Sequence, residues 1–147
     1  MPDNTDTCPC GSDRPFASCC EPVIHGATAP SAEALMRSRY SAYVTGAWAY
    51  LRESWHPDTR PSRVSPTNTD WLGLTILKSG TDTVEFIAGF MEGARVMTLH
   101  ETSRFAKVDG HWRYLDGVCD VSEAARNSRC PCGSGKKTKY CCMKKSP

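Results

Sequence analysis

The cysteines constrain this chain more than any other residue type. Nine of the 147 residues are cysteines, and eight of them lie in two clusters at the two ends of the sequence. The clusters are Cys8, Cys10, Cys19 and Cys20 at one end, and Cys130, Cys132, Cys141 and Cys142 at the other. A segment this short cannot bury a core of its own, so a bound metal is expected to supply the free energy that orders it. The sequence therefore predicts two metal knuckles, over residues 1–25 and 126–147.

The two clusters form an internal repeat. Aligning CPCGSDRPFASCC with CPCGSGKKTKYCC gives identity at seven of thirteen positions. Four thiolates are typical of a tetrahedral structural zinc site, and iron fits the same geometry. We therefore expect two zinc ions, with iron, or thiols that act only as redox pairs, as the alternatives. Side chains of adjacent residues diverge in an extended strand, so each Cys-Cys pair should lie on a turn or at the end of a short helix.

The composition limits the classes of protein to which this chain can belong. Apolar residues make up 39% and charged residues 23% of the chain, which is enough for one packed domain. The N-terminal residues include acids and cysteines where a signal peptide would have lysines and then an apolar run, and no apolar stretch is long enough to span a membrane. A cytoplasmic location is expected, and in that reducing compartment clustered cysteines bind metal more often than they form disulfides.

The central region predicts an α+β domain over residues 30–120. Between Ser31 and Trp55, apolar side chains recur at spacings of three and four, which predicts one long amphipathic helix with Ser31 as its N-cap. Gly46 weakens the centre of that helix. The segment over residues 57–70 contains three prolines and should be a loop.

The apolar period then changes to two, which indicates antiparallel strands. The alternating positions are Leu72, Leu74 and Ile76; Val84, Phe86, Ala88 and Phe90; Met97, Leu99, Glu101, Ser103 and Phe105; and Trp112 with Tyr114. Turn residues lie between these runs at 80–82, 92–94 and 109–110. A long helix packed on a curved antiparallel sheet follows from this pattern.

The motif at the C-terminal end resembles a known metal-binding sequence. CPCGSGKKTKYCC is similar to the SEC-C motif, the zinc-binding tail of the SecA translocation motor. The resemblance implies that Cys130, Cys132, Cys141 and Cys142 are the ligands and that the basic positions face a partner. The N-terminal copy departs from the motif, because Asp13 stands at the position of Gly135 and Arg14-Pro15 at that of Lys136-Lys137. Asp tolerates a left-handed backbone better than most residues, so its turn can be retained.

The whole arrangement resembles one family. The segments LMRSRYSAYV, WLGLTIL and ETSRF, placed between two SEC-C motifs, are similar to the YchJ family of bacterial proteins. This resemblance implies a nuclear-transport-factor-2-like cone for the central domain, a fold that often encloses a pocket. It implies little about mechanism.

One acidic residue stands out in the predicted sheet. Glu101 shares a strand face with apolar side chains, where an unpaired carboxylate is costly. It is expected either to form a buried ion pair with Arg37 or Arg39 from the helix, or to act as the acid of a pocket in the cone. Cys119, outside both clusters, is expected to be a half-buried thiol. No nucleophile elbow, phosphate-binding glycine loop or zinc-protease signature is present, so the sequence predicts no enzyme.

The tail carries an uneven charge. Residues 126–147 contain seven bases and no acid, whereas the whole chain has a net charge of +2. These bases either only solubilise the knuckle or form a docking surface with Lys136, Lys137, Lys139 and Tyr140 at its centre. The SEC-C resemblance implies a protein partner, such as an export chaperone of the SecB type or the ribosome, with RNA contacted only as part of the ribosome.

Two functional hypotheses follow from these patterns. The first is a non-catalytic metal-binding adaptor that docks through its basic C-terminal knuckle. The second is a pocket protein, either a small-ligand binder or an enzyme, in which Glu101 is the central polar group. An iron-containing or redox-responsive metal protein is a further alternative.

Overall fold

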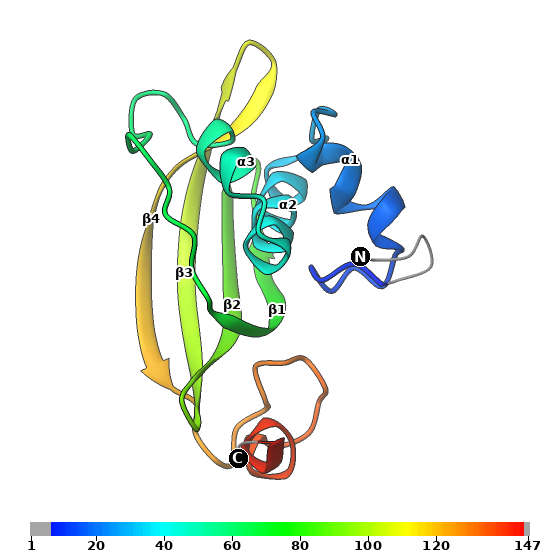
Figure 1. The fold of residues 1–147 in the computed structure, drawn as a ribbon, viewed down its shortest axis with the longest axis vertical. Helices are drawn as coiled ribbons and strands as arrows, with labels where there is room; N and C mark the ends of the chain where they lie inside the picture. The colour runs from blue at the N-terminus through cyan, green and yellow to red at the C-terminus, as the bar shows by residue number, and fades with distance from the viewer. Residues whose placement is uncertain (1–6, 146–147) are drawn as a thin grey trace.

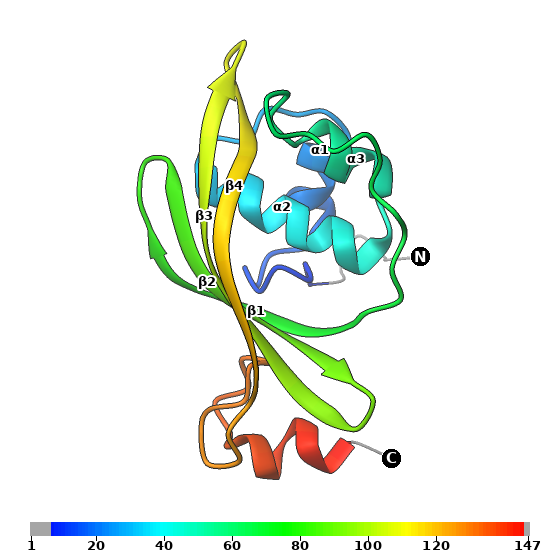
Figure 2. The same cartoon turned by 90° about the vertical axis from the view of Figure 1, so that its left-hand side faces the viewer.

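A curved antiparallel sheet forms one layer of the molecule. The computed structural model describes residues 7–145, and its four strands follow one another in the order β1-β2-β3-β4. The strands are β1 (Asp70–Ser79), β2 (Thr83–Glu92), β3 (Arg95–Val108) and β4 (His111–Glu123). The helices of the central domain cover one face of this sheet, which bends around them (Figures 1 and 2). This arrangement confirms the α+β prediction.

The turns of the sheet lie where the sequence places them. Asp109 and Gly110 both have positive φ, 53° and 83°, as expected of a tight hairpin between β3 and β4. Register shifts interrupt the β1–β2 pairing between Trp71 and Gly73, and the β3–β4 pairing at Arg104. Such bulges bend strands, which explains the curvature of the sheet. β4 runs to Glu123 and so extends past residue 120, where the sequence ends the domain.

The single helix predicted over Ser31–Trp55 is wrong, because the chain forms two helices there. They are α2 (Ala32–Thr45) and α3 (Trp48–Glu53). Ser31 is the N-cap of α2 and accepts a hydrogen bond from the backbone N–H of Ala34, as predicted. Gly46 ends α2 in a left-handed conformation with φ 82°, and its N–H bonds to the carbonyl of Ala42. Glycine adopts this conformation without a steric penalty, so the break falls on it.

The main core lies between α2 and the concave face of the sheet. Leu35, Met36 and Tyr40 from α2 pack against alternate residues of the strands, among them Phe86 and Phe105, and all are buried. No helix in the part of the chain that the structure describes is both long and apolar enough to cross a membrane.

The two ends of the chain fold as short knuckles. The N-terminal knuckle contains η1 (Phe16–Ser18) and α1 (Cys20–Ile24), and the C-terminal knuckle contains η2 (Thr138–Tyr140) and η3 (Cys142–Lys145). Each Cys-Cys pair joins the end of one helical turn to the start of the next, as the sequence predicted. In Figure 1 the N-terminal knuckle lies beside α2, whereas the C-terminal one lies at the far end of the sheet.

Candidate metal centres

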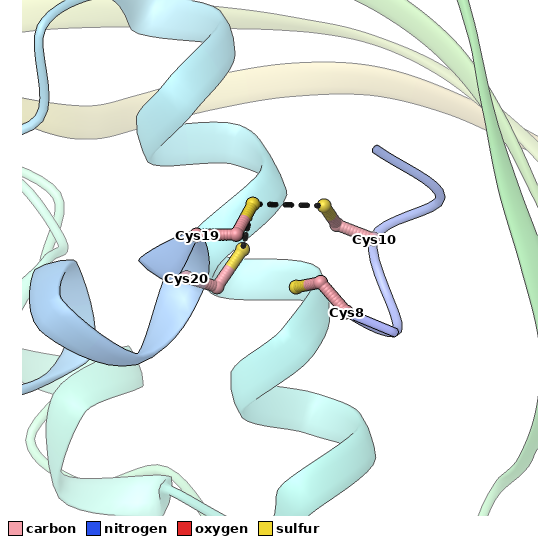
Figure 3. A group of neighbouring side chains, drawn as sticks. All are labelled: Cys8, Cys10, Cys19 and Cys20. Carbon is pink, nitrogen blue, oxygen red and sulfur yellow. Dashed lines mark hydrogen bonds between the residues drawn. The ribbon is translucent and has the colours of Figure 1, made fainter. Parts of the chain in front are cut away.

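The four N-terminal cysteines converge on one point. The sulfur atoms of Cys8, Cys10, Cys19 and Cys20 all lie within 4.8 Å of one another. Figure 3 shows Cys8 and Cys10 on a loop that faces Cys19 and Cys20 at the start of α1. The Sγ atoms of Cys10 and Cys19 are 3.7 Å apart, and those of Cys19 and Cys20 are 3.9 Å apart.

The four C-terminal cysteines form a second group of the same kind. The sulfur atoms of Cys130, Cys132, Cys141 and Cys142 also lie within 4.8 Å of one another, and the Sγ atoms of Cys132 and Cys141 are 3.5 Å apart. A tetrahedron with metal–sulfur bonds of about 2.3 Å, the zinc–thiolate length, has edges of about 3.8 Å. The measured separations fit that figure, so each group can hold one metal ion.

Matching hydrogen bonds support the two groups. Ser12 Oγ lies 3.1 Å from Cys19 Sγ, and Ser134 Oγ lies 3.2 Å from Cys141 Sγ. The same hydroxyls accept backbone N–H bonds from Arg14 and Lys136, at 3.2 Å in both copies. Hydrogen bonds to the sulfur atoms orient metal ligands and stabilise their charge. The repeat therefore extends from the cysteines to the groups around them.

The backbone of the two knuckles also repeats. Gly11 and Gly133 have φ values of 82° and 87°, and Asp13 and Gly135 have φ values of 65° and 83°. Asp13 thus takes the left-handed position that glycine holds in the C-terminal copy, which confirms the expectation for that turn. The backbone N–H of Cys8 bonds to the carbonyl of Arg14, as that of Cys130 bonds to the carbonyl of Lys136, both at 2.8 Å.

The sulfur atoms of each group perturb one another's pKa. Hydrogen bonds from Cys20 and Cys8 lower the pKa of Cys10 far below its usual range, and hydrogen bonds to Cys10 and Cys8 raise the pKa of Cys20. Burial alone would raise the pKa of Cys132, but hydrogen bonds from Ser134 and Cys141 lower it to about 6. In each group the surroundings thus favour the thiolate form of one cysteine, Cys10 or Cys132, and the protonated form of another, Cys20 or Cys142. A divalent metal displaces such protons when it binds.

The N-terminal knuckle is attached to helix α2. Cys8 Sγ lies 3.4 Å from Ser41 Oγ, in a fully buried contact. Arg37 Nη1 donates to the carbonyl of Cys10 at 2.7 Å and lies 3.8 Å from its Sγ. Phe16 and three of the four cysteines belong to the main core, so this metal group is part of the domain interior.

The C-terminal knuckle sits against the other side of the sheet, on a pair of glycines. Gly73 of β1 and Gly89 of β2 are cross-strand partners. A Cβ atom on Gly73 would lie 2.6 Å from the carbonyl oxygen of Cys132, and one on Gly89 would lie 2.7 Å from Cβ of Pro131. Any side chain at either position would displace the knuckle. The paired glycines therefore form its seat.

The predicted partner-binding residues lie together on the C-terminal knuckle. Lys136 and Lys137 are exposed, Lys139 is half-buried, and Tyr140 is 58% exposed. Lys139 Nζ lies 5.1 Å from the centre of the Tyr140 ring. The C-terminal knuckle that carries them lies at the end of the molecule away from α1, α2 and α3 (Figure 1).

The expected ion pair of Glu101 is wrong. Within the described residues, Glu101 contacts neither Arg37, which binds Glu33, nor Arg39, which binds Leu51 and Ser54. Glu101 instead accepts hydrogen bonds from Ser103 and Tyr114 and lines a cavity in the concave face of the sheet. This position agrees with the alternative expectation, a pocket in the central domain.

The expectation of a half-buried Cys119 is also wrong, because its side chain is exposed. Cys119 is the register partner of Glu101 on β4. All residues of β4 from Gly117 to Glu123 are exposed, since β4 is an edge strand and the helices do not cover this part of it. An edge position cannot be read from the alternation of residues alone.

Sequence patterns missed the groups that support the metal sites. Ser12 and Ser134 occupy identical positions of the repeat, which was the available signal for their common role. Nothing in the sequence points to Arg37 beside Cys10, or to Gly73 and Gly89 beneath the C-terminal knuckle, because these contacts join distant segments.

Comparisons with known proteins agree with this architecture. The family model for the middle domain of YchJ, described as NTF2-like, matches residues 31–117, and the SEC-C motif matches residues 5–22 and 126–144. The chain also resembles the crystal structure of a SEC-C motif containing protein from Psychrobacter arcticus. That likeness has a TM-score of 0.64 and 28% identity over 95% of this chain and 96% of the other.

Three bacterial proteins illustrate the relationship. The chain is 45% identical to a UPF0225 protein of Photorhabdus laumondii over 94% of its length and 99% of the relative. It is 43% identical to one of Serratia proteamaculans, with 93% and 97% covered, and 40% identical to UPF0225 protein YchJ of Shigella dysenteriae, with 92% and 96% covered. None of these names states a reaction. With this identity along nearly the whole chain, an NTF2-like middle domain and a four-cysteine SEC-C motif at each end, the protein belongs to the YchJ family, UPF0225.

Proposed function

We propose that this chain is a non-catalytic cytoplasmic adaptor. In this proposal both four-cysteine groups hold zinc, and the basic C-terminal knuckle docks on an acidic protein partner. An export chaperone of the SecB type or the ribosome is the partner class that the SEC-C motif suggests. The two metal ions stabilise the folded knuckles and take no part in a reaction.

The exposed charge of the C-terminal knuckle carries the proposal. Arg126, Arg129, Lys136 and Lys137 are exposed, and residues 126–147 contain no acid. A surface of one sign attracts partners of the opposite sign and speeds their encounter. The four-cysteine group and the glycine seat would hold these bases in a fixed arrangement, which reduces the entropy lost on binding.

The two knuckles differ where the proposal requires it. Pro15 and Ala17 replace Lys137 and Lys139 in the N-terminal copy, and Phe16, at the position of Thr138, is buried in the main core. Thr138 is buried too, so the two segments have the same pattern of exposure and differ in their charge. The C-terminal segment carries Lys136, Lys137 and Lys139 where the N-terminal one has the single base Arg14, which favours the C-terminal knuckle as the docking element.

Charge reversal of the knuckle tests the proposal. We expect the triple variant Lys136→Glu, Lys137→Glu, Lys139→Glu to lose binding to purified SecB-type chaperone or to ribosomes, measured by biolayer interferometry. Metal content and melting temperature should stay close to wild type, because these side chains are not ligands. Wild-type binding should weaken as salt rises, since a Debye length of about 10 Å at 0.1 M shortens further with added salt.

A matched control separates local docking from total charge. The triple variant Arg63→Glu, Lys78→Glu, Lys107→Glu reverses three exposed bases away from the knuckle. It should keep binding. Equal loss in both triple variants, or retained binding in the knuckle variant, would contradict a docking role for this surface.

A further inference from the structure

A cavity separate from both metal groups lies between helix α2, the concave face of the sheet and the loop before β1. Its volume is about 290 Å³, near the lower limit of the roughly 300–1,000 Å³ typical of small-molecule sites. Its walls are largely aromatic, with Tyr40, Trp55, Trp71, Phe86 and Tyr114 among them. A cavity with such walls can hold a small apolar body.

One acid on the sheet is held in place inside this cavity. Ser103 Oγ donates to Glu101 Oε2 at 2.5 Å, and the hydroxyl of Tyr114 donates to the same oxygen at 3.2 Å. Burial and the Glu101 carboxylate raise the pKa of Tyr114, so its hydroxyl keeps the proton that it donates. A Cβ atom on Gly117 would collide with the Glu101 carboxylate, so the glycine makes room for it. Oε1 accepts no hydrogen bond from the residues that the structure describes.

One base from helix α2 lines the same cavity. Arg39 is only 6% exposed, and its Nη1 donates to the carbonyl of Leu51 and to Ser54 Oγ, at 2.7 and 2.6 Å. Its guanidinium carbon lies 4.6 Å from the centre of the Tyr114 ring and 5.1 Å from that of Trp55. Within the described residues, its Nε and Nη2 make no hydrogen bond and no carboxylate lies close enough for an ion pair.

Glu101 and Arg39 are the only charged side chains among the described residues that line the cavity. The two side chains are not in contact with each other. Oε1 of Glu101 can therefore still accept a hydrogen bond, and Nε and Nη2 of Arg39 can still donate. The two buried indole N–H groups without an acceptor among the described residues, those of Trp55 and Trp71, also belong to the cavity walls. The polar groups of this cavity are therefore incompletely satisfied by the protein itself.

Electroneutrality limits what this cavity can accept. Burial of an uncompensated charge is costly, and a ligand with a net charge would unbalance the Glu101 and Arg39 pair. A ligand with both a positive and a negative group, and no net charge, can meet both side chains. We propose that the cavity binds a small zwitterion with an apolar body, of the size and charge pattern of an aromatic amino acid. Its ammonium meets Glu101 Oε1 and its carboxylate meets the free donors of Arg39.

Three probes with one apolar body test this charge pattern on the full-length wild-type protein. They are phenylalanine, phenethylamine and 3-phenylpropionate, which carry both charges, the positive charge alone and the negative charge alone. Titration at millimolar concentration, followed by calorimetry, should show that phenylalanine binds about tenfold tighter than either singly charged probe. Equal affinities, tighter binding of a singly charged probe, or no binding of phenylalanine would overturn the proposal.

A variant and a matched control test the role of Glu101. Glu101→Gln keeps the shape of the side chain and should lower the affinity for phenylalanine by about tenfold. The affinity for 3-phenylpropionate should stay unchanged or increase. Glu85→Gln removes the same charge from the outer face of the sheet, where Glu85 binds His100, and should change neither affinity. Equal effects in the two variants would contradict a site at Glu101.

A blocking variant covers the case in which Glu101→Gln does not fold. Leu99→Trp adds volume to a half-buried wall position and should abolish phenylalanine binding. Undiminished binding would place the ligand elsewhere and overturn the proposal. Partner docking by the basic knuckle involves a different surface, so the two proposals can fail independently.

Discussion

At the scale of single residues, Glu33 and Arg37 connect the N-terminal metal group to the domain. Arg37 Nε donates to Glu33 Oε2 at 2.9 Å, while its Nη1 binds the carbonyl of Cys10. Glu33 also accepts a hydrogen bond from Ser79 at the end of β1. One ion pair thus joins the knuckle, α2 and the sheet, and it orients a group that touches a metal ligand.

This link predicts a pH-dependent stability. Hydrogen bonds from Ser79 and Arg37 lower the pKa of Glu33 below its usual 4.5. A lowered pKa stabilises the folded state above the unfolded value, and this contribution is lost as the pH falls through the folded value. Wild type should exceed Glu33→Gln in stability at neutral pH by no more than about 1 kcal/mol, because the side chain is partly exposed. The difference should vanish in acid, as measured by urea unfolding.

An exposed carboxylate at the end of α3 provides the control for this prediction. Glu53→Gln changes an exposed acid that makes no ion pair within the described residues. Its stability relative to wild type should vary little with pH. A Glu33→Gln difference that persists unchanged at about pH 3 would show that its cause is not the ionised carboxylate.

The role of a single residue could be predicted from the sequence only where the residue belongs to the internal repeat or acts on its near neighbours in the chain. The eight clustered cysteines and the left-handed turn at Asp13 follow from the repeat, and the Ser31 cap follows from the helix pattern. The partner of Glu101 did not follow, because Arg39 lies across the cavity and its nitrogen binds the backbone of α3. Long-range choices among several polar partners depend on the packed structure.

At the scale of elements, the period of apolar residues identified the strands but gave one helix where there are two. The same spacing of three and four continues on both sides of Gly46, so the pattern cannot show a change of direction. The left-handed glycine was the signal for the break. The order of the strands also followed from the short turns, because each hairpin joins neighbours.

The contact between the C-terminal knuckle and the sheet makes a prediction at this scale. Gly89→Ala would place a Cβ atom 2.7 Å from Cβ of Pro131, closer than such atoms approach in folded proteins. The variant should lose about 1–3 kcal/mol of unfolding free energy. Hydrogen exchange over residues 126–145 should speed up more than exchange in the core strands, because the knuckle must move away from its seat.

A double-mutant cycle checks the cause. Pro131→Gly removes the two nearest atoms that the new methyl group would meet, Cβ and Cγ of Pro131. The two substitutions should show a coupling energy of about 0.5–3 kcal/mol, as expected of residues in contact. Strictly additive effects would contradict the contact between the knuckle and this glycine.

At the scale of the whole molecule, the two metal groups have the same geometry but different surroundings. Cys8, Cys10 and Cys20 belong to the main core, with Leu35 and Phe86 among its members. The C-terminal cysteines belong to a separate small cluster with Val96 and Ala124. The shared cysteine spacing does not distinguish the two knuckles, whereas packing makes one an interior element of the domain and the other an appendage.

Paired cysteine variants test this asymmetry. Cys8→Ser with Cys10→Ser, and Cys130→Ser with Cys132→Ser, should each lower the metal content by one ion per chain, as measured by elemental analysis of protein purified without oxygen. The first variant should lose about 3 kcal/mol or more of domain stability, because metal binding there orders part of the main core. The second should lose clearly less, because it loosens a knuckle that packs in a separate small cluster and not in the main core. Equal losses of stability would show that both knuckles contribute equally to the fold. Iron in place of zinc in the elemental analysis would favour a redox-responsive metal protein over the adaptor.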